Sequence, residues 1–189
     1  MGIRIKSFEV TTITILILGL SGCSALRDGS TTIKPSQLSS YSPDLDAELG
    51  SRNNPIPLGD EVQINDWQVE VLSVNKDASK FVSSLDEYAN PPSVGEQFLL
   101  ISIRATYLGS ESGEPSSDLR FKIVGSKGNT FSKSCGYAAD TFAQNEETFT
   151  GASVLGNLCF VVDANQITGA TVSIQGNYSS QDRRFVSIE

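Results

Sequence analysis

The chain has 189 residues, and its 14 basic and 22 acidic side chains give a formal net charge of −8, with no histidine. The absence of histidine excludes Ser-His-Asp and Cys-His nucleophiles, histidine-ligated zinc and an imidazole general base. An acidic chain without a basic cluster is also a poor partner for nucleic acid, so we expect no nucleic-acid binding and no cofactor. Any charged partner should be cationic or bridged by a cation, although the acidity also serves solubility.

Residues 1–22 predict a lipoprotein signal peptide. Two basic residues precede an apolar run over residues 10–20, which Ser21 and Gly22 close. A charged start, a short apolar middle and small residues at the cut are typical of a secretory signal. A transmembrane helix needs about 20 consecutive apolar residues, and Arg27 comes too soon for that.

Cys23 is the candidate lipidation site. The stretch Leu20-Ser21-Gly22-Cys23 resembles the lipobox of bacterial lipoproteins, in which the cysteine carries a diacylglyceryl group and becomes the first residue after cleavage. Two acyl chains hold a protein stably on a bilayer, whereas one chain is marginal. We therefore expect the protein to be anchored through lipid on Cys23 at the extracytoplasmic face of the cell membrane. A free or disulfide-forming Cys23 is the alternative.

Cys135 and Cys159 then remain as an even pair in an oxidising compartment. We expect them to form a disulfide, which would close about 25 residues and stabilise the fold by about 3.5 kcal/mol in the chain-entropy model. A two-cysteine metal site is the alternative, but it lacks further soft ligands, and no metal site is assigned.

Residues 23–54 predict a lipidated flexible tether. They are rich in Ser, Asp, Pro and Gly, and their isolated hydrophobic residues show no period. A coil of this length would hold the folded part about 30 Å from the membrane. The carboxylates of Asp44, Asp46 and Glu48 could bind calcium weakly, but the glycine and distal glutamate of an EF-hand loop are missing.

Residues 55–189 predict a domain of β-strands, because apolar residues recur at every second position in short runs. In the early runs, over 61–64 and 67–74, a change of parity at Leu72 and Val74 predicts a bulge or the end of strand pairing. Trp67 is expected in the core, with a ligand-stacking platform as the alternative.

The run over 97–107 carries apolar side chains on both faces and should be a central strand. The alternation over 119–123 leads into a hairpin-type turn at 125–129. Further strands are expected at 154–162, 171–174 and 184–188. Seven or eight short strands without a helical repeat predict an all-β, antiparallel β-sandwich.

The segment 76–96 is too long for a hairpin turn, and long loops in compact domains are often functional or disordered. Phe81, Val82, Leu85 and Tyr88 recur at helical spacing, so we expect a short helical turn that caps one end of the sandwich. This segment either packs against the domain or binds a partner.

Five segments together carry a family resemblance: residues 50–59, 67–72, 95–107, 121–129 and 150–160. In this order they resemble an immunoglobulin-like domain of unknown function that is common in lipoproteins of Gram-positive bacteria. The resemblance extends to the immunoprotective extracellular antigen-like family of actinobacteria.

This resemblance implies an immunoglobulin-like sandwich outside the membrane and supplies no catalytic residues. The chain departs from the usual family pattern at Tyr107-Leu108-Gly109, where an asparagine is typical. The actinobacterial branch tends to carry a cysteine pair like Cys135 and Cys159, which agrees with the pairing expected from the cysteine count.

The function favoured by the sequence is a lipid-anchored cell-surface protein with a non-catalytic binding domain, whose ligand would be an envelope protein or a peptide. An edge strand could recruit an extended partner by strand addition. A structural or stress-protective envelope lipoprotein is one alternative. A carboxylate-based enzyme accessory domain is the other, built on acids such as Asp86, Glu87, Glu146 or Glu147. We do not expect an enzyme.

Overall fold

A computed structural model describes residues 47–85, 90–136, 138–142, 147–177 and 179–189, with the backbone alone for 179–181. Cys23 and the segment predicted as a signal peptide lie outside these residues. In the described part, neither helix is long and apolar enough to cross a membrane.

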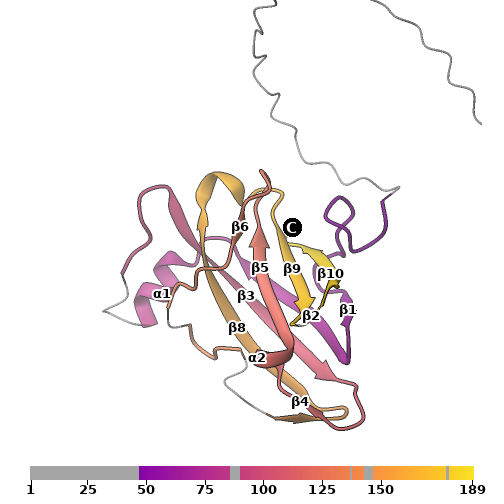
Figure 1. The fold of residues 1–189 in the computed structure, drawn as a ribbon. Helices are drawn as coiled ribbons and strands as arrows, with labels where there is room; N and C mark the ends of the chain where they lie inside the picture. The colour runs from indigo at the N-terminus through magenta and orange to yellow at the C-terminus, as the bar shows by residue number, and fades with distance from the viewer. Residues whose placement is uncertain (1–46, 86–89, 137, 143–146, 178) are drawn as a thin grey trace, which may run out of the picture. The chain divides into compact units, whose positions relative to one another are not determined.

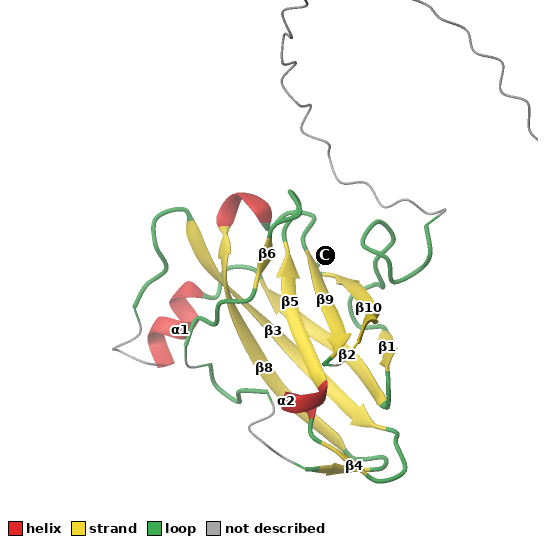
Figure 2. Cartoon of the chain, viewed as in Figure 1, coloured by secondary structure: helices red, strands yellow, loops and turns green. Residues whose placement is uncertain are grey.

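Two four-stranded sheets face each other (Figures 1 and 2). The first sheet has the spatial order β1 (Glu61–Ile64), β2 (Trp67–Asn75), β3 (Glu96–Tyr107) and β8 (Ser153–Asp163). The second has the order β10 (Ser179–Ser187), β9 (Thr171–Gly176), β5 (Leu119–Val124) and β6 (Thr130–Phe131). A separate two-stranded pair consists of β4 (Ser112–Gly113) and β7 (Thr148–Phe149).

Every pairing between these strands is antiparallel. The helical elements are α1 (Ser79–Leu85), α2 (Pro115–Asp118) and a 3₁₀ turn at Ala164–Gln166.

The strand connectivity is that of the immunoglobulin fold. The strands β2, β3 and β8 correspond to A, B and E of one sheet, and β6, β5, β9 and β10 correspond to C′, C, F and G of the other. The short strand β1 adds a hairpin partner to β2. The predicted antiparallel β-sandwich is therefore confirmed, and the eight strands of the two sheets match the predicted seven or eight.

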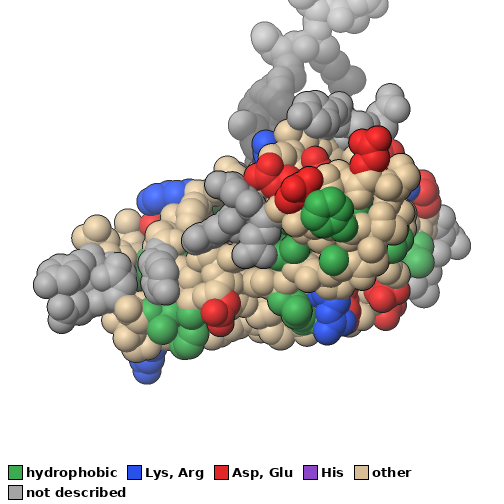
Figure 3. All heavy atoms as spheres, turned by 90° about the horizontal axis from the view of Figure 1, so that it is seen from below, with side chains coloured by type: hydrophobic (Ala, Val, Ile, Leu, Met, Phe, Trp, Pro, Cys, Tyr) green, Lys and Arg blue, Asp and Glu red, His purple; other side chains and the backbone are tan. Residues whose placement is uncertain are grey.

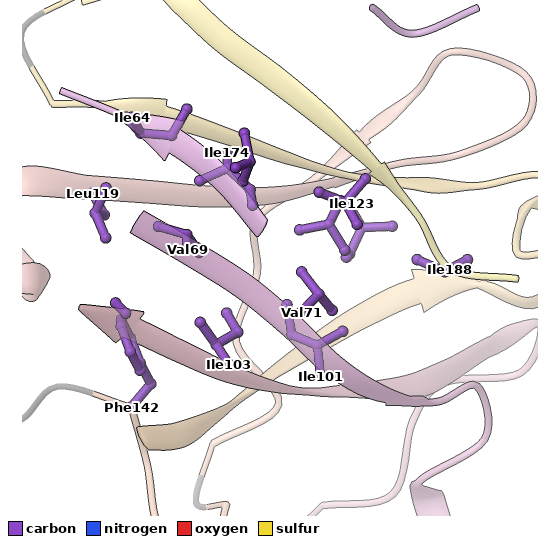
Figure 4. Packing of buried hydrophobic residues seen from close by; sticks show 14 of the residues in the cluster. Ile64, Val69, Val71, Ile101, Ile103, Leu119, Ile123, Phe142, Ile174 and Ile188 are labelled. Carbon is purple, nitrogen blue, oxygen red and sulfur yellow. The ribbon is translucent and has the colours of Figure 1, made fainter. Parts of the chain in front are cut away.

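The hydrophobic core fills the space between the two sheets. In Figure 4, Ile64, Val69 and Val71 of the first sheet lie across from Ile123 and Ile174 of the second. Their alternation with polar residues follows from the pleat, which turns successive side chains to opposite faces. Burial of this apolar surface is the main stabilising contribution to the sandwich.

Trp67 belongs to this core, with an exposed fraction of 1%. Its ring contacts that of Tyr107, with 5.0 Å between the centroids. The predicted core position is therefore confirmed. The bulge expected at Leu72 is also confirmed, since the register between β2 and β3 shifts between Val71 and Ser73.

The outer face of β3 is buried as well. Phe98 and Leu100 pack there against Ala78 and Val82 at the N-terminal part of α1. This second cluster explains why the run over 97–107 is apolar on both faces. The helix expected in segment 76–96 is confirmed, but it covers the outer face of β3 rather than one end of the sandwich. Val82 packs there, whereas Phe81 and Leu85 are exposed and Tyr88 lies outside the described residues.

Residues 47–54 lie within the predicted tether but bond to the sandwich. The Phe185 amide nitrogen donates to the Gly50 carbonyl oxygen at 2.8 Å. The Arg52 Nη2 donates to the Gly125 carbonyl oxygen at 3.2 Å. The C-terminal part of the segment 23–54 is thus held against β10 and the turn between β5 and β6.

Candidate functional site

Residues 132–136 and 138–142, here called the strap, run along the edge of β8 and are visible in Figure 2 as the loop that leaves β6 and passes α1. The Val161 amide donates to the Lys133 carbonyl oxygen at 2.9 Å. The Cys135 amide donates to the Cys159 carbonyl oxygen at 3.3 Å. The strap therefore satisfies backbone groups of β8 that a free edge would expose.

Asn157 of β8 holds the other end of the strap. Its backbone amide donates to the Asp140 carbonyl oxygen at 2.7 Å, and its carbonyl oxygen accepts from the Phe142 amide at 2.9 Å. Its side-chain Nδ2 donates to the Ala139 carbonyl oxygen at 2.8 Å. The remaining Oδ1 accepts from Ser102 Oγ at 2.5 Å. The amide side chain is thereby committed to positioning the strap.

A disulfide joins the strap to β8. It links Cys135 to Cys159 with 5.5 Å between the Cα atoms, an ordinary separation for a disulfide. Cys159 is buried in the cluster beneath α1, and Cys135 packs against that cluster. The covalent link therefore fixes the strap at the outer face of the first sheet.

Phe142 turns from the strap into the main core, as Figure 4 shows. Its ring meets that of Phe121 edge to face, with 5.6 Å between the centroids. Gly156 makes this entry possible because a Cβ atom there would lie 2.3 Å from the Phe142 Cα. The strap is thus anchored by one covalent link and one aromatic side chain.

A pocket of about 290 Å³ lies between β5, β8, α2 and the strap. The large apolar side chains that line it come from both sheets and from the strap: Leu119, Phe121, Phe142, Leu158 and Phe160. Its size and apolar, aromatic lining are typical of small-molecule sites, which begin at about 300 Å³.

Six polar residues of the described chain also line the pocket, and most of their side chains bond to the protein itself. Thr141 Oγ1 donates to the Ala138 carbonyl oxygen at 2.7 Å. Ser134 Oγ accepts from the Gly136 amide at 3.2 Å. Among the described residues, Arg120 is the one charged side chain that lines the pocket, and none of the lining residues carries a carboxyl group. The described part of the site therefore combines an apolar wall with neutral polar groups and one cationic group.

A second, smaller pocket of about 230 Å³ lies beside Trp67 and Tyr107 and is lined by Asp66 and Asp118. Trp67 Nε1 donates to Asp118 Oδ2 at 3.0 Å, and this oxygen also accepts from the Glu114 amide at 3.1 Å. These bonds hold α2 against the first sheet, which is a structural role.

Burial raises the pKa of Tyr107, and the carboxylates of Asp66, Asp118 and Glu111 raise it further. A phenol with a raised pKa stays neutral at physiological pH. It can donate a hydrogen bond but offers no phenolate nucleophile.

The carboxylates proposed for an enzymatic role do not line the pocket under the strap. Asp86, Glu87 and Glu146 lie outside the described residues. Glu147 is exposed and accepts from Ser112 Oγ at 2.6 Å in the β4–β7 pair.

The proposed calcium cluster is also mostly outside the described chain. Asp44 and Asp46 are not described, and Glu48 is exposed. Among the described residues, no group of three or more acidic or cysteine side chains could hold a metal ion.

The sheet edges offer little room for strand addition. The strap covers β8, and Ile56 bonds to both Phe185 and Ser187 of β10. Among the described strands of the two sheets, the remaining edges are the four residues of β1, the two residues of β6 and the start of β5, which β6 pairs only at Ile123 and Val124. Short or covered edges are how native sheets avoid unwanted pairing, so these edges do not favour binding by strand addition.

The face seen from below in Figure 3 shows no block of one charge. Acidic and basic side chains are spread over it, with hydrophobic groups between them. This face therefore offers no basic stripe of the kind that binds a phosphate backbone.

Sequence reasoning did not find the pocket. Its walls come from α2, β5, β8 and the strap, which are far apart along the chain. The strap has no hydrophobic period, and its one sequence signal is Cys135, which ties it to Cys159.

No family model matches the chain, and no curated protein matches it. Three solved structures resemble the fold. The YjhA protein of Bacillus subtilis is 12% identical over 71% of this chain and 99% of its own, with a TM-score of 0.47. The secreted protein MPT63 of Mycobacterium tuberculosis is 16% identical over 70% of this chain and 94% of its own, with a TM-score of 0.44. An uncharacterised β-sandwich protein of Clostridium difficile is 8% identical over 72% of this chain and 95% of its own, with a TM-score of 0.44.

Proposed function

We propose that this chain is a lipid-anchored extracytoplasmic protein whose immunoglobulin-like domain binds an apolar ligand group in the pocket under the strap, without catalysis. The observation that carries the proposal is the pocket itself, an opening of about 290 Å³ with five large apolar side chains on its walls. Protein interiors are normally packed to a density that leaves few voids larger than a water molecule.

The pocket favours a binding role over a purely structural envelope role. A domain selected for stability alone gains by closing such a gap, because buried apolar contacts replace solvated surface. Here the disulfide and the bonds of Asn157 fix the strap to β8, and the pocket lined by Leu158 and Phe160 remains beside it. A rigid wall of this kind lowers the conformational cost of binding.

The same lining gives no support to a carboxylate-based enzyme accessory domain. General acid or base catalysis needs a carboxyl group within hydrogen-bond reach of the reacting atoms. The described lining of the pocket includes serine, threonine and asparagine groups and Arg120, but no Asp or Glu.

Export and anchoring are supported by the lipobox-like stretch that ends at Cys23 and by the disulfide between Cys135 and Cys159. Disulfides persist in oxidising compartments and are rare in the cytosol. Cys23 supplies the one thiol left for lipidation, since the chain has three cysteines.

The anchoring is tested by expressing Cys23→Ser in a Gram-positive host and comparing membrane and medium fractions with the wild type. We expect the wild type in the membrane fraction, with a diacylglyceryl mass on Cys23, and the variant in the medium or as uncleaved precursor. Unchanged membrane retention of the variant would contradict the anchor.

The binding site is tested with a neutral apolar probe, 1-octanol, titrated into the full chain carrying Cys23→Ser. We expect backbone amide shifts in NMR spectra to gather in the strap and β8. Ser132→Trp should abolish them, because Ser132 is exposed and lines the pocket, so that an indole there fills the opening. The matched control is Ser83→Trp, an exposed serine of α1 that does not line this pocket. Shifts that persist in Ser132→Trp would place the binding elsewhere.

A further inference from the structure

The charge of the pocket distinguishes it from the rest of the molecule. The chain carries −8 overall, yet the one charged side chain among the described residues that line this pocket is Arg120. Among the described residues, ion pairs join Lys76 to Glu189 and Arg104 to Glu70, and none involves Arg120.

Backbone carbonyl groups hold the Arg120 guanidinium at the pocket. Its Nη1 donates to the Ser116 carbonyl oxygen at 2.7 Å and to the Leu119 carbonyl oxygen at 3.3 Å, and both of these residues line the pocket. A guanidinium has five N–H donors in a planar fork, and the two bonds use Nη1. The Nε and Nη2 donors have no partner among the described residues and match the two oxygens of a carboxylate.

The nearby acidic groups are engaged with other partners. Glu114 Oε1 accepts from Ser116 Oγ at 2.8 Å. Asp118 Oδ2 accepts from Trp67 Nε1 at 3.0 Å. Both carboxylates lie on α2 or at its start, and neither lines the pocket.

The apolar walls set the size of the rest of the ligand. A cavity of about 150 Å³ accommodates benzene, which has six heavy atoms. A pocket of about 290 Å³ therefore accommodates about ten heavy atoms. The aromatic groups of Phe121, Phe142 and Phe160 provide contact for an alkyl chain or for another ring.

We infer that the pocket under the strap takes a small carboxylic acid of about ten heavy atoms in all, whose carboxylate binds Arg120 while its apolar chain lies on the phenylalanine wall. This inference rests on the proposed function. It adds a ligand class, a medium-chain fatty acid or an arylalkanoic acid, to the binding site.

The test compares octanoate with 1-octanol, which has the same chain length and no charge, in the full chain carrying Cys23→Ser. Arg120 is an exposed residue, so we expect octanoate to bind about three- to fivefold more tightly, which is the upper range for an exposed ion pair. Arg120→Gln should remove this advantage and leave 1-octanol binding unchanged. Arg120→Lys should retain part of it, because the charge stays while the planar fork is lost.

Lys127→Gln is the matched control, since it removes the same charge from the exposed turn after β5 and does not line the pocket. It should leave the preference for octanoate intact. Thermal unfolding of each variant checks that the fold is retained.

Different outcomes of this experiment test the ligand class and the binding site separately. Equal affinity for octanoate and 1-octanol, with both lost in Ser132→Trp, would overturn the ligand class and leave the binding site standing. Binding of either probe that Ser132→Trp does not weaken would overturn the site and the proposed function together. A preference for octanoate that survives Arg120→Gln would place the carboxylate on another group and overturn the assignment of Arg120.

Discussion

At the scale of single residues, the strap depends on the glycine of β8 that faces it. Gly156 is buried, and Phe142 passes directly over it into the core. A methyl group at this position would meet the backbone of Phe142, which cannot rotate away as the end of a flexible side chain can. Space for the strap is therefore created by the absence of a side chain.

We predict that Gly156→Ala lowers the free energy of unfolding by about 2 kcal/mol, the range of overpacking substitutions. The added Cβ would lie 2.3 Å from the Phe142 Cα and 2.6 Å from its amide nitrogen. Urea unfolding measures the change. The control is Leu155→Ala on the adjacent residue, whose side chain is 60% exposed and which should change stability by less than about 0.5 kcal/mol. Equal effects of the two substitutions would contradict the close approach of the strap.

Tyr107 makes the stability of the fold depend on pH in the alkaline range. Burial and the nearby carboxylates raise its pKa above 10.0, so the folded state keeps the phenolic proton to a higher pH than the unfolded chain does. The stabilisation that the neutral phenol contributes to the folded state is fully present below the pKa of the unfolded state. It is lost as pH rises through the folded pKa. We predict that wild-type stability falls above about pH 10 more steeply than that of Tyr107→Phe. Urea midpoints of both proteins, measured across this interval, check the difference, and parallel curves would refute it.

At the scale of elements, the strap depends on its covalent link to β8. The disulfide closes the segment from Cys135 to Cys159, a separation of 24 residues. Cross-linking a segment of this length lowers the entropy of the unfolded chain. The bonds of Asn157 and the insertion of Phe142 involve neither cysteine, so we expect them to persist in the reduced protein.

We predict that the double substitution Cys135→Ser with Cys159→Ser lowers the free energy of unfolding by about 3.5 kcal/mol. Thermal unfolding of the wild type with a reductant should give the same loss. Hydrogen exchange should speed up first at the amides of Val161 and Cys135, which bond across this joint. A wild type that is indifferent to the reductant, together with a variant of unchanged stability, would contradict this role of the disulfide.

The elements that sequence reasoning located are those whose side chains carry a period. The strand β3 was predictable because it places apolar residues at regular spacing against the core and the second cluster. The helix α1 was predictable from the same kind of spacing, although of its apolar residues Val82 alone is buried. The strap was not, because it is held by backbone bonds to an edge strand, and such bonds need no particular side chain. The pocket was missed for a related reason, since its walls combine four segments whose proximity depends on how the sheets pair.

At the scale of the whole molecule, acidic side chains clearly outnumber basic ones. The net charge is −8, while the two ion pairs of the described chain lie at the surface, with Lys76 and Arg104 side chains 42% and 45% exposed. Exposed pairs contribute about 0–1 kcal/mol each, so they do little to offset the repulsion among the remaining carboxylates. Compaction brings these charges together, and this lowers the stability of the folded state.

This excess of acidic charge determines whether added salt raises or lowers the free energy of unfolding. Sodium chloride at about 0.15 M shortens the screening length to about 8 Å, which weakens the long-range repulsion more than it weakens contacts such as the 2.7 Å bond from Arg104 to Glu70. We predict that raising the salt from about 0.01 M to 0.15 M increases the free energy of unfolding by a few tenths to about 1 kcal/mol, measured by urea unfolding at pH 7. Glucose at equal osmolality serves as the uncharged control. It should produce only a small part of this increase in the free energy of unfolding. A decrease in the free energy of unfolding on adding salt would mean that local ion pairs outweigh the net repulsion. The acidic surface would then stabilise the fold rather than destabilise it.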